Sequence, residues 1–454
     1  MPAIKRDPLA FLQSVVARHG DLVAFPMPTG AVLLVNDPVA ARRVLQDNHR
    51  NYSKQTVQYA SLAAVTGSGL LTADGDGWRT RRRIVQPAFH HSSLDGVAGQ
   101  AVEAALRLRA RWDAAPDGRL DADAAILRAM LDVVGRTLFD ADLAEAGERI
   151  VGAVDDTLGI VVRRAQSLVP ASWPTPGRRR FRRAIEVLDQ ACFDVVRARR
   201  ERGVRDQDAD VLALLLRAAA AGELSDRQVR DELVTLVIAG HETVASALTW
   251  TLYLLAEHPR WQDALAAELD SVLGEPPGDL LGDHTEQRLP GWTDLSRLRV
   301  TRAVVDEALR LYPPAWVITR RAVGPDVLAG VAVPAGTLVI LSPWLLHRRA
   351  DVWPDPERFD PGRFLDTERS APRGDYVPFG AGPRLCIGRD HALVESVLVL
   401  ATLLHGRRVL RPAGAPPPKA DALVTLRPHG GLTLYLRPLY LRPLYLGRGD
   451  GDRA

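Results

Sequence analysis

One short segment carries residue types that suit metal binding. The sequence FGAGPRLCIG at residues 379–388 places Cys386 among three glycines, directly before a helix expected to begin near Asp390. Glycines permit positive φ and let a backbone approach a flat ligand closely. The amides and dipole of a helix N-terminus favour an anion, so a thiolate there would be stabilised as a metal ligand. Arg384 stands two residues earlier and can reach an acidic group on the same face.

A free cysteine can also be buried as a small apolar side chain. Packing alone does not need the glycine pattern around Cys386, so we interpret this residue as a metal ligand. Cys192 stands in a helical run, DQACFDVVRARR, without such a setting, and we expect it in the core. These two cysteines are the only ones, which excludes a disulfide scaffold and a zinc site of several thiolates.

A second candidate site lies in the sequence AGHET at residues 239–243, in the middle of an apolar helix. Glu242 is costly to bury there without a partner or water. Gly240 lowers the stability of a helix by about 1 kcal/mol relative to alanine. Together these residues predict a local distortion of the helix that makes room for a ligand. A zinc-binding His-Glu-x-x-His helix is excluded because Ala245 stands four residues after His241. We expect His241 itself to be structural.

Two further spacings place side chains on one helix face. Glu307 and Arg310 are three residues apart, and Trp78 and Arg82 are four apart. Alone, the first pair could be a surface ion pair worth about 0–1 kcal/mol, and the second could belong to a basic solvated helix. Arginine also suits carboxylate ligands, because its guanidinium binds them through two parallel hydrogen bonds.

Most of the elements expected to position these residues are helices. Residues 20–35 predict a β-hairpin, and Asp37 is expected to cap a helix over residues 37–46. Apolar spacing predicts further helices over 94–199 (with a proline-rich break at 169–177), 225–258, 295–312 and 392–404. Short strands are expected over 320–341, and turns over 353–379.

The composition is that of an ordinary globular protein. The chain has 454 residues, of which 46% are hydrophobic and 25% charged, which excludes disorder as its main state. A net charge of +3 is too balanced for a nucleic-acid-binding protein. The first residues lack the apolar core of a signal peptide. No uncharged apolar run reaches the ~20 residues that span a bilayer, so we expect a cytoplasmic protein without a transmembrane segment.

These motifs, in this order, resemble those of the cytochromes P450. The segment FGAGPRLCIG is similar to the haem-ligand loop of that family. The resemblance implies a mainly α-helical prism with small β-sheets, and haem b held with Cys386 as its axial ligand. It also implies that Glu242 and Thr243 form the acid–alcohol pair that delivers protons during dioxygen activation.

The resemblance assigns roles to further residues. The residues that would hold the haem are Trp78, Arg82, Arg320 and Arg384 at the propionates, and Phe379 in the loop itself. Those that would form a structural triad beside the haem loop are Glu307, Arg310 and Arg358, the last of which lies in the sequence Pro-Glu-Arg-Phe.

As a P450, the protein would insert one oxygen atom from O₂ into a C–H bond of a hydrophobic small molecule. Electrons would come through a ferredoxin and its reductase, and Arg79, Arg81 and Arg83 would face such an acidic partner. We expect a monomer. The basic cluster at residues 178–183 could contact anionic lipid as a peripheral membrane site, although a solvated helix start is favoured.

Longer matches suggest a substrate class. Residues 66–72 (TGSGLLT), 239–250, 309–321 and 424–432 look like the bacterial P450s that hydroxylate carotenes. The expected substrate is therefore a carotenoid or another terpenoid, in a pocket drawn from residues 58–65, 169–185 and 314–318. A fatty-acid hydroxylase, a peroxide-driven P450 and a non-enzymatic haem sensor remain as alternatives.

The end of the chain repeats a five-residue unit. LYLRP occurs at residues 434–438 and again at 439–443. A unit this short does not build a solenoid. We expect a single P450 domain over residues 1–433 and a repetitive tail over residues 434–454.

Overall fold

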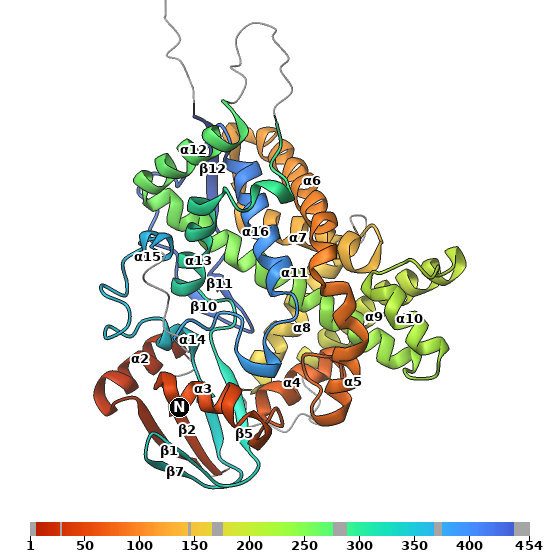
Figure 1. The fold of residues 1–454 in the computed structure, drawn as a ribbon, viewed down its shortest axis with the longest axis vertical. Helices are drawn as coiled ribbons and strands as arrows, with labels where there is room; N and C mark the ends of the chain where they lie inside the picture. The colour runs from red at the N-terminus through yellow and green to blue at the C-terminus, as the bar shows by residue number, and fades with distance from the viewer. Residues whose placement is uncertain are drawn as a thin grey trace, which may run out of the picture.

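The computed structural model describes residues 6–27, 30–143, 147–165, 176–275, 288–366 and 375–439. Figure 1 shows a large helical part and, beside it, a smaller part near the N-terminus built around a β-sheet. The helices are α2 (Pro8–His19), α3 (Pro38–Arg42), α4 (Val57–Thr66), α5 (Gly75–Val85), α6 (Leu94–Asp113), α7 (Ala122–Phe139), α8 (Gly147–Ala165), α9 (Pro176–Arg202), α10 (Val211–Ala220), α11 (Asp226–Glu257), α12 (Pro259–Leu273), α13 (Arg299–Leu311), α14 (Pro343–Leu346), α15 (Gly362–Leu365) and α16 (Arg389–Leu404). The expected mainly α-helical fold is confirmed.

The strands form small sheets. They are β1 (Leu22–Met27), β2 (Gly30–Val35), β3 (Tyr52–Ser53), β4 (Arg119–Asp121), β5 (Ile318–Ala322), β6 (Asp326–Leu328), β7 (Val331–Val333), β8 (Leu338–Leu341), β9 (Arg407–Leu410), β10 (Ala420–Ala422), β11 (Leu426–Pro428) and β12 (Thr433–Pro438). The main sheet has the order β1-β2-β8-β5-β3, in which β1 and β2 are the predicted antiparallel hairpin. It therefore joins the start of the chain to the segment after α13.

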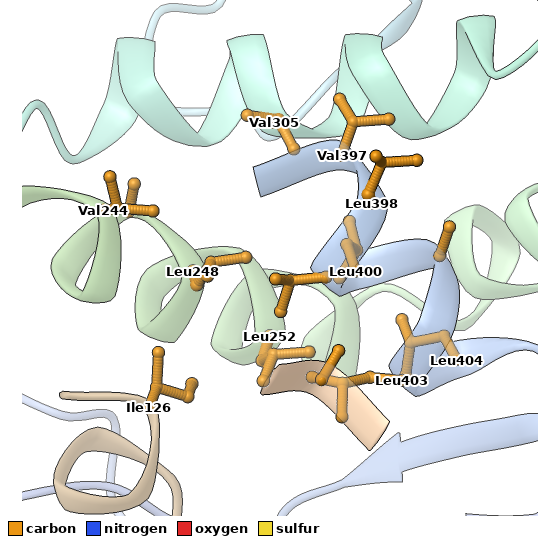
Figure 2. Packing of buried hydrophobic residues seen from close by; sticks show 14 of the residues in the cluster. Ile126, Val244, Leu248, Leu252, Val305, Val397, Leu398, Leu400, Leu403 and Leu404 are labelled. Carbon is orange, nitrogen blue, oxygen red and sulfur yellow. The ribbon is translucent and has the colours of Figure 1, made fainter. Parts of the chain in front are cut away.

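Helix α11 runs through the centre of the helical part. Its N-terminus is closed by a capping box between Ser225 and Gln228. Val244, Leu248 and Leu252 lie four residues apart and form one face, which meets Leu400 of α16 (Figure 2). By length and composition α11 could cross a membrane, but 83% of its apolar window is buried inside the protein, as in a core helix.

Several helices differ from their predicted limits. The stretch predicted as helical over residues 94–199 is divided into α6, α7, α8 and α9, with β4 between the first two, and α16 begins three residues earlier than predicted. Helix α13 begins four residues later than predicted, because residues 295–297 form a turn in which the Arg297 and Leu298 N–H groups both donate to the Asp294 carbonyl oxygen (2.8 and 3.1 Å). Helix α3 ends at Arg42 and continues as a wider π-helical turn, η1 (Arg43–Asp47). This π-helical turn contacts the loop that contains Cys386.

The first copy of the C-terminal repeat belongs to the fold. Strand β12 contains residues 434–438 and pairs with β4 on one side and β9 on the other. Leu434 and Leu436 are buried, because alternate residues of a strand point to the same face. The expected boundary at residue 433 is therefore wrong for this copy. Apart from Leu439, the second copy lies outside the described residues.

Candidate active site

Cys386 lies in a tightly folded loop between η7 (Gly382–Arg384) and α16. Its N–H donates to the Phe379 carbonyl oxygen (3.0 Å), which closes the loop. Gly382 has φ +66°, and a Cβ there would collide with the Leu45 carbonyl oxygen of η1, so only glycine fits. The loop is thus fixed against the part of the chain that precedes α4.

The Cys386 thiol faces an internal cavity. The side chain is exposed to this cavity, which it lines. Burial raises the pKa of the thiol, while the Gly388 N–H and the Arg82 guanidinium act in the opposite direction. A metal bound here would favour the thiolate form.

The cavity brings most of the predicted residues together. It has a volume of about 330 Å³ and is lined from α4, α5, α11, α16 and the segments around residues 314–320, 378–388 and 424–425. The predicted residues that line it are Trp78, Arg82, Glu242, Thr243, Arg320, Phe379, Arg384 and Cys386. Glu307, Arg310 and Arg358 do not line it, in agreement with a structural role.

Four cationic side chains form one wall of the cavity: Lys54, Arg82, Arg320 and Arg384. Burial, Arg320 and Arg384 together hold the pKa of Lys54 well below its usual value. Burial likewise lowers the pKa of Arg384 to about 10, although this residue is paired with Asp74. Positive charge therefore exceeds negative charge on this wall, which fits a ligand that carries carboxylates.

Other contacts hold these cations in place. The Arg384 guanidinium lies over the Trp78 ring, 3.9 Å from its centroid. Arg82 donates to the Leu385 carbonyl oxygen (2.8 Å) and so ties α5 to the cysteine loop. Lys54 was missed from the sequence, since it stands in no motif and joins the cluster only through the fold.

The predicted acid and alcohol lie on adjacent positions of α11. Thr243 Oγ1 donates to the Ala239 carbonyl oxygen (2.6 Å). Helix α11 is continuous through these residues, so the expectation of a local distortion is wrong; the hydroxyl accommodates itself to an ordinary helix. Glu242 is 3% exposed, and its Oε1 accepts a hydrogen bond from Thr425 Oγ1 (2.9 Å). Burial raises the pKa of Glu242 to about 7.

Glu242 lies in the electrostatic field of an ion-pair network that reaches the surface. Arg427, two residues after Thr425, lowers the pKa of Glu242 and so partly offsets its burial. Arg427 pairs with Asp123 (2.7 Å) and with Asp155 (2.5 Å), and the latter side chain is 46% exposed. Thr425 was missed from the sequence because it lies about 180 positions from Glu242.

His241 takes no part in this arrangement. Its ring nitrogen Nδ1 lies 2.5 Å from the Val237 carbonyl oxygen, and burial lowers its pKa to about 4. The ring does not line the cavity. The expected structural role fits this placement.

The predicted triad needs one correction. Glu307 and Arg310 are fully buried and form two hydrogen bonds (2.7 and 2.8 Å). The Arg358 side chain is exposed, and only its carbonyl oxygen accepts from Arg310 (3.1 Å). The second guanidinium beside Glu307 belongs to Arg363, at 3.4 Å. Both arginines stand in Pro-x-Arg-Phe sequences five residues apart, so the sequence offered two equivalent matches.

The arginines of α5 do not all face outward as expected. Arg79 pairs with Asp76, and Arg83 pairs with Glu223 (2.6 Å) at the surface. Arg81 is buried and lies 3.0 Å from the Glu232 carboxylate. It therefore cannot contact a partner protein.

The predicted pocket segments are partly correct. Tyr59 and Leu62 line the cavity, as do residues 314, 315 and 318. Trp316 instead packs outside the cavity and donates to the Leu423 carbonyl oxygen (2.8 Å). Of the region 169–185, residues 169–175 lie outside the described residues, and the described part of α9 does not line the cavity. Glu395 of α16 lines the cavity, and burial raises its pKa to about 8.

A helical fold in which a thiol faces a cavity walled by cations fits a protein that binds an acidic metal cofactor. The family model for cytochrome P450 matches residues 2–434. The chain therefore belongs to the cytochrome P450 family and is a P450 monooxygenase. The family implies a haem–thiolate cofactor, and the thiol of Cys386 and the excess of cations fit it.

Known relatives support this assignment. Cyclooctat-9-en-7-ol 5-monooxygenase of Streptomyces melanosporofaciens is 36% identical, over 90% of this chain and 86% of its own length. Pentalenene oxygenase of Streptomyces avermitilis is 35% identical (89% and 87%), and the chloroplastic protein LUTEIN DEFICIENT 5 of Arabidopsis thaliana is 32% identical (93% and 73%). The solved structure of CYP175A1 from Thermus thermophilus is 32% identical, with a TM-score of 0.76 and 96% of each chain covered.

Proposed function

We propose that this P450 hydroxylates a terpenoid, with the ring of a carotenoid or a smaller cyclic terpene as the reacting part. The observation that carries the proposal is the apolar part of the cavity lining. This lining comprises Leu62, Leu70, Leu71, Val134, Leu138, Leu236, Ile238, Val244, Pro314 and Ile318. Such a surface binds hydrocarbon through the area that it removes from water. The terpenoid names of three relatives support the same class.

A long-chain fatty acid fits this cavity less well. Its carboxylate would need a cation other than those assigned to the cofactor. Among the described lining residues, the cations other than histidine are Lys54, Arg82, Arg320 and Arg384, and these form the wall assigned to the cofactor. The lining thus favours a ligand without a carboxylate.

We assign haem b as the cofactor, with Cys386 as axial ligand and the four cations at its propionates. Covalent attachment would need further cysteines, but Cys192 is buried in the core and Cys386 is the ligand. When bound, the haem would supply the activation of O₂ and the insertion of one oxygen atom into a C–H bond. Arg310 joins α13 to the segments around residues 347 and 356–358 through three carbonyl oxygens.

In this proposal Glu242 and Thr243 manage protons. With a pKa near neutrality, Glu242 can both release and take up a proton at the pH of the cell. Thr243 lines the cavity one residue further along α11. A peroxide-driven enzyme would not need this pair. Thr243→Ala should therefore lower product per reductant consumed and release more peroxide, and unchanged coupling would contradict the relay.

We propose a ferredoxin with its reductase as electron source, and a monomeric enzyme in the cytoplasm. The exposed hollow lined by Trp78, Arg79, Arg83 and His90 on α5 and after it carries basic groups that suit an acidic partner. At the start of α9, Arg180 pairs with Asp156 at the surface (2.6 Å), which favours a solvated helix over lipid contact.

The test is optical. The ferric protein would be titrated with β-carotene, a cyclic sesquiterpene and a long-chain fatty acid while the Soret band is recorded. A shift toward the high-spin form with one terpenoid class identifies the ligand that displaces water from the iron. A shift with the fatty acid alone would overturn the terpenoid proposal, and the absence of a Soret band after haem loading would overturn the role of Cys386.

A further inference from the structure

The segment of residues 67–73, here called the leucine segment, lies between α4 and α5, against the N-terminal half of α11. Two of its residues, Leu70 and Leu71, line the cavity. The segment has no helix or strand pairing of its own. Backbone turns shape the segment, as where the Ala73 N–H donates to the Gly69 carbonyl oxygen (2.8 Å), and side chains of other elements fix it to the rest of the protein.

Two carboxylates of α11 hold the backbone of the leucine segment. The Ser68 N–H donates to Asp231 Oδ2 (2.9 Å), and the Leu70 N–H donates to Glu232 Oε2 (3.0 Å). The approach is so close that a Cβ on Gly67, which has φ +58°, would collide with the Asp231 carboxylate. Charged acceptors make stronger hydrogen bonds than neutral ones.

Each carboxylate is paired with an arginine. Arg81 Nε lies 3.0 Å from Glu232 Oε1, and these side chains are 7% and 0% exposed. Arg81 also donates to Ser68 Oγ (3.0 Å), so it binds the leucine segment as well as α11. Arg230 lies 3.1 Å from Asp231 and donates to the Val65 carbonyl oxygen (2.9 Å) at the end of α4.

The other end of the leucine segment reaches the cationic wall. Lys54 Nζ donates to the Leu71 carbonyl oxygen (2.8 Å). Arg81 directly precedes Arg82, which belongs to that wall. The two cavity leucines are thus held between α11 and the groups assigned to the cofactor.

Glu232 is unusual among these groups. Burial raises its pKa to about 7, and the Leu70 N–H and Arg81 keep it from rising further. A buried charge in an ion pair is poorly explained by stability alone, because a matched apolar pair often serves as well. The better-attested reason for a protein to keep a buried ion pair is that the pair fixes the geometry of the groups that it joins.

We propose that Glu232 and Arg81 are positioning residues that set where Leu70 and Leu71 stand in the cavity, and so determine which ligands it accepts. This inference rests on the proposed function, since it takes the cavity as the substrate site. Neither residue lines the cavity. They act through the leucine segment.

The first measurement is hydrogen–deuterium exchange of peptides that cover the leucine segment. Glu232→Gln keeps the size of the side chain but removes its charge. We expect faster exchange at residues 67–73 in this variant. The matched control is Glu223→Gln, which breaks the exposed pair with Arg83 of helix α5. Unchanged exchange in Glu232→Gln would overturn the proposal.

The second measurement separates positioning from general damage. Imidazole and 4-phenylimidazole would be titrated into the haem-loaded protein, because only the second ligand carries a ring into the apolar lining. We expect Glu232→Gln to weaken 4-phenylimidazole about tenfold, the effect of ~1.4 kcal/mol, with imidazole and the Glu223→Gln control nearly unchanged.

Other results have distinct meanings. Equal weakening of both ligands would place the effect at the iron and so overturn the positioning role. Unchanged affinity for both ligands would also overturn it. If Glu232→Gln does not fold, Arg81→Lys keeps the charge but loses the donor to Ser68, and the same selective loss is expected. No spectral change with either ligand in the unaltered protein would instead refute the haem site of the proposed function.

Discussion

Glu242 shows how its surroundings decide what a carboxyl can do. It is buried, yet it receives a hydrogen bond from Thr425 and lies in the field of Arg427. Burial favours the protonated form, and the hydrogen bond and the cation favour the ionised form. The balance leaves a carboxyl that can change protonation near neutral pH, as a proton donor and acceptor must.

Removing the Thr425 hydroxyl should disturb that balance in one direction. Thr425→Val takes away a hydrogen bond to the ionised carboxylate, so the pKa of Glu242 should rise above its value of about 7. The acid limb of the pH profile of coupled turnover should then move upward by about one pH unit. The control is Ser246→Ala, which removes a neighbouring bond from α11 to the Leu426 carbonyl oxygen. An unmoved limb would show that Thr425 does not tune Glu242.

Glu395 should make stability depend on pH. Burial raises its pKa from 4.5 unfolded to about 8 folded. A raised carboxyl pKa costs no stability below the unfolded value, and the cost grows as pH rises toward the folded value. Relative to the unaltered protein, Glu395→Gln should therefore gain about 2–4 kcal/mol in free energy of unfolding between pH 5 and pH 8. Urea unfolding at matched haem content measures this, and a difference independent of pH would contradict it.

Helix α13 is an element whose role depends on a distant turn. It presents Glu307 and Arg310 to the segment 356–363, where carbonyl oxygens and Arg363 complete the buried network. The spacing within α13 was readable from the sequence, because three residues make almost one helical turn. The arginine that pairs with Glu307 from the distant turn could not be read from the sequence, because two Pro-x-Arg-Phe sequences satisfy the same pattern.

The two arginines should therefore differ sharply on substitution. Arg363→Ala leaves Glu307 with one cation fewer in a buried site and should lower the free energy of unfolding by about 1–3 kcal/mol. Arg358→Ala removes an exposed side chain and should change it by about 0.5 kcal/mol or less. Urea unfolding of both variants tests the assignment, and the reverse order would restore Arg358 to the triad.

How much of the site could be predicted depends on whether the signal of a residue is local in the sequence or arises only through folding. Cys386, Glu242 and Thr243 were found because their signals lie within one loop or one helix turn. Lys54 and Thr425 were missed because they meet the site only through folding. Arg81 was misplaced because helical spacing tells which residues share a face but not which face is buried.

Strand β12 joins the end of the described chain to the rest of the fold. It lies between β4 and β9, and its Leu434 and Leu436 are buried. The predicted boundary missed this because a repeat in sequence gives no sign of which copy pairs with a sheet. The helices and the first hairpin were predicted well because their apolar patterns are local.

Truncation should locate this boundary. A chain that ends at residue 439 keeps every described contact of β12 and should fold and bind haem. A chain that ends at residue 433 loses two buried leucines, each worth about 2–5 kcal/mol, which exceeds much of the usual stability of a protein. Circular dichroism and the Soret band would compare the two, and a folded shorter chain would return the boundary to residue 433.

The cationic wall has a consequence for how the protein is made. Without an acidic ligand, Lys54, Arg82, Arg320 and Arg384 repel one another in a region of low dielectric constant. A ligand that binds only the folded chain stabilises it in proportion to the logarithm of its free concentration. Haem supply during biosynthesis should therefore govern how much of this chain survives proteolysis, and iron-starved cells should accumulate less of the polypeptide even when its messenger RNA is unchanged.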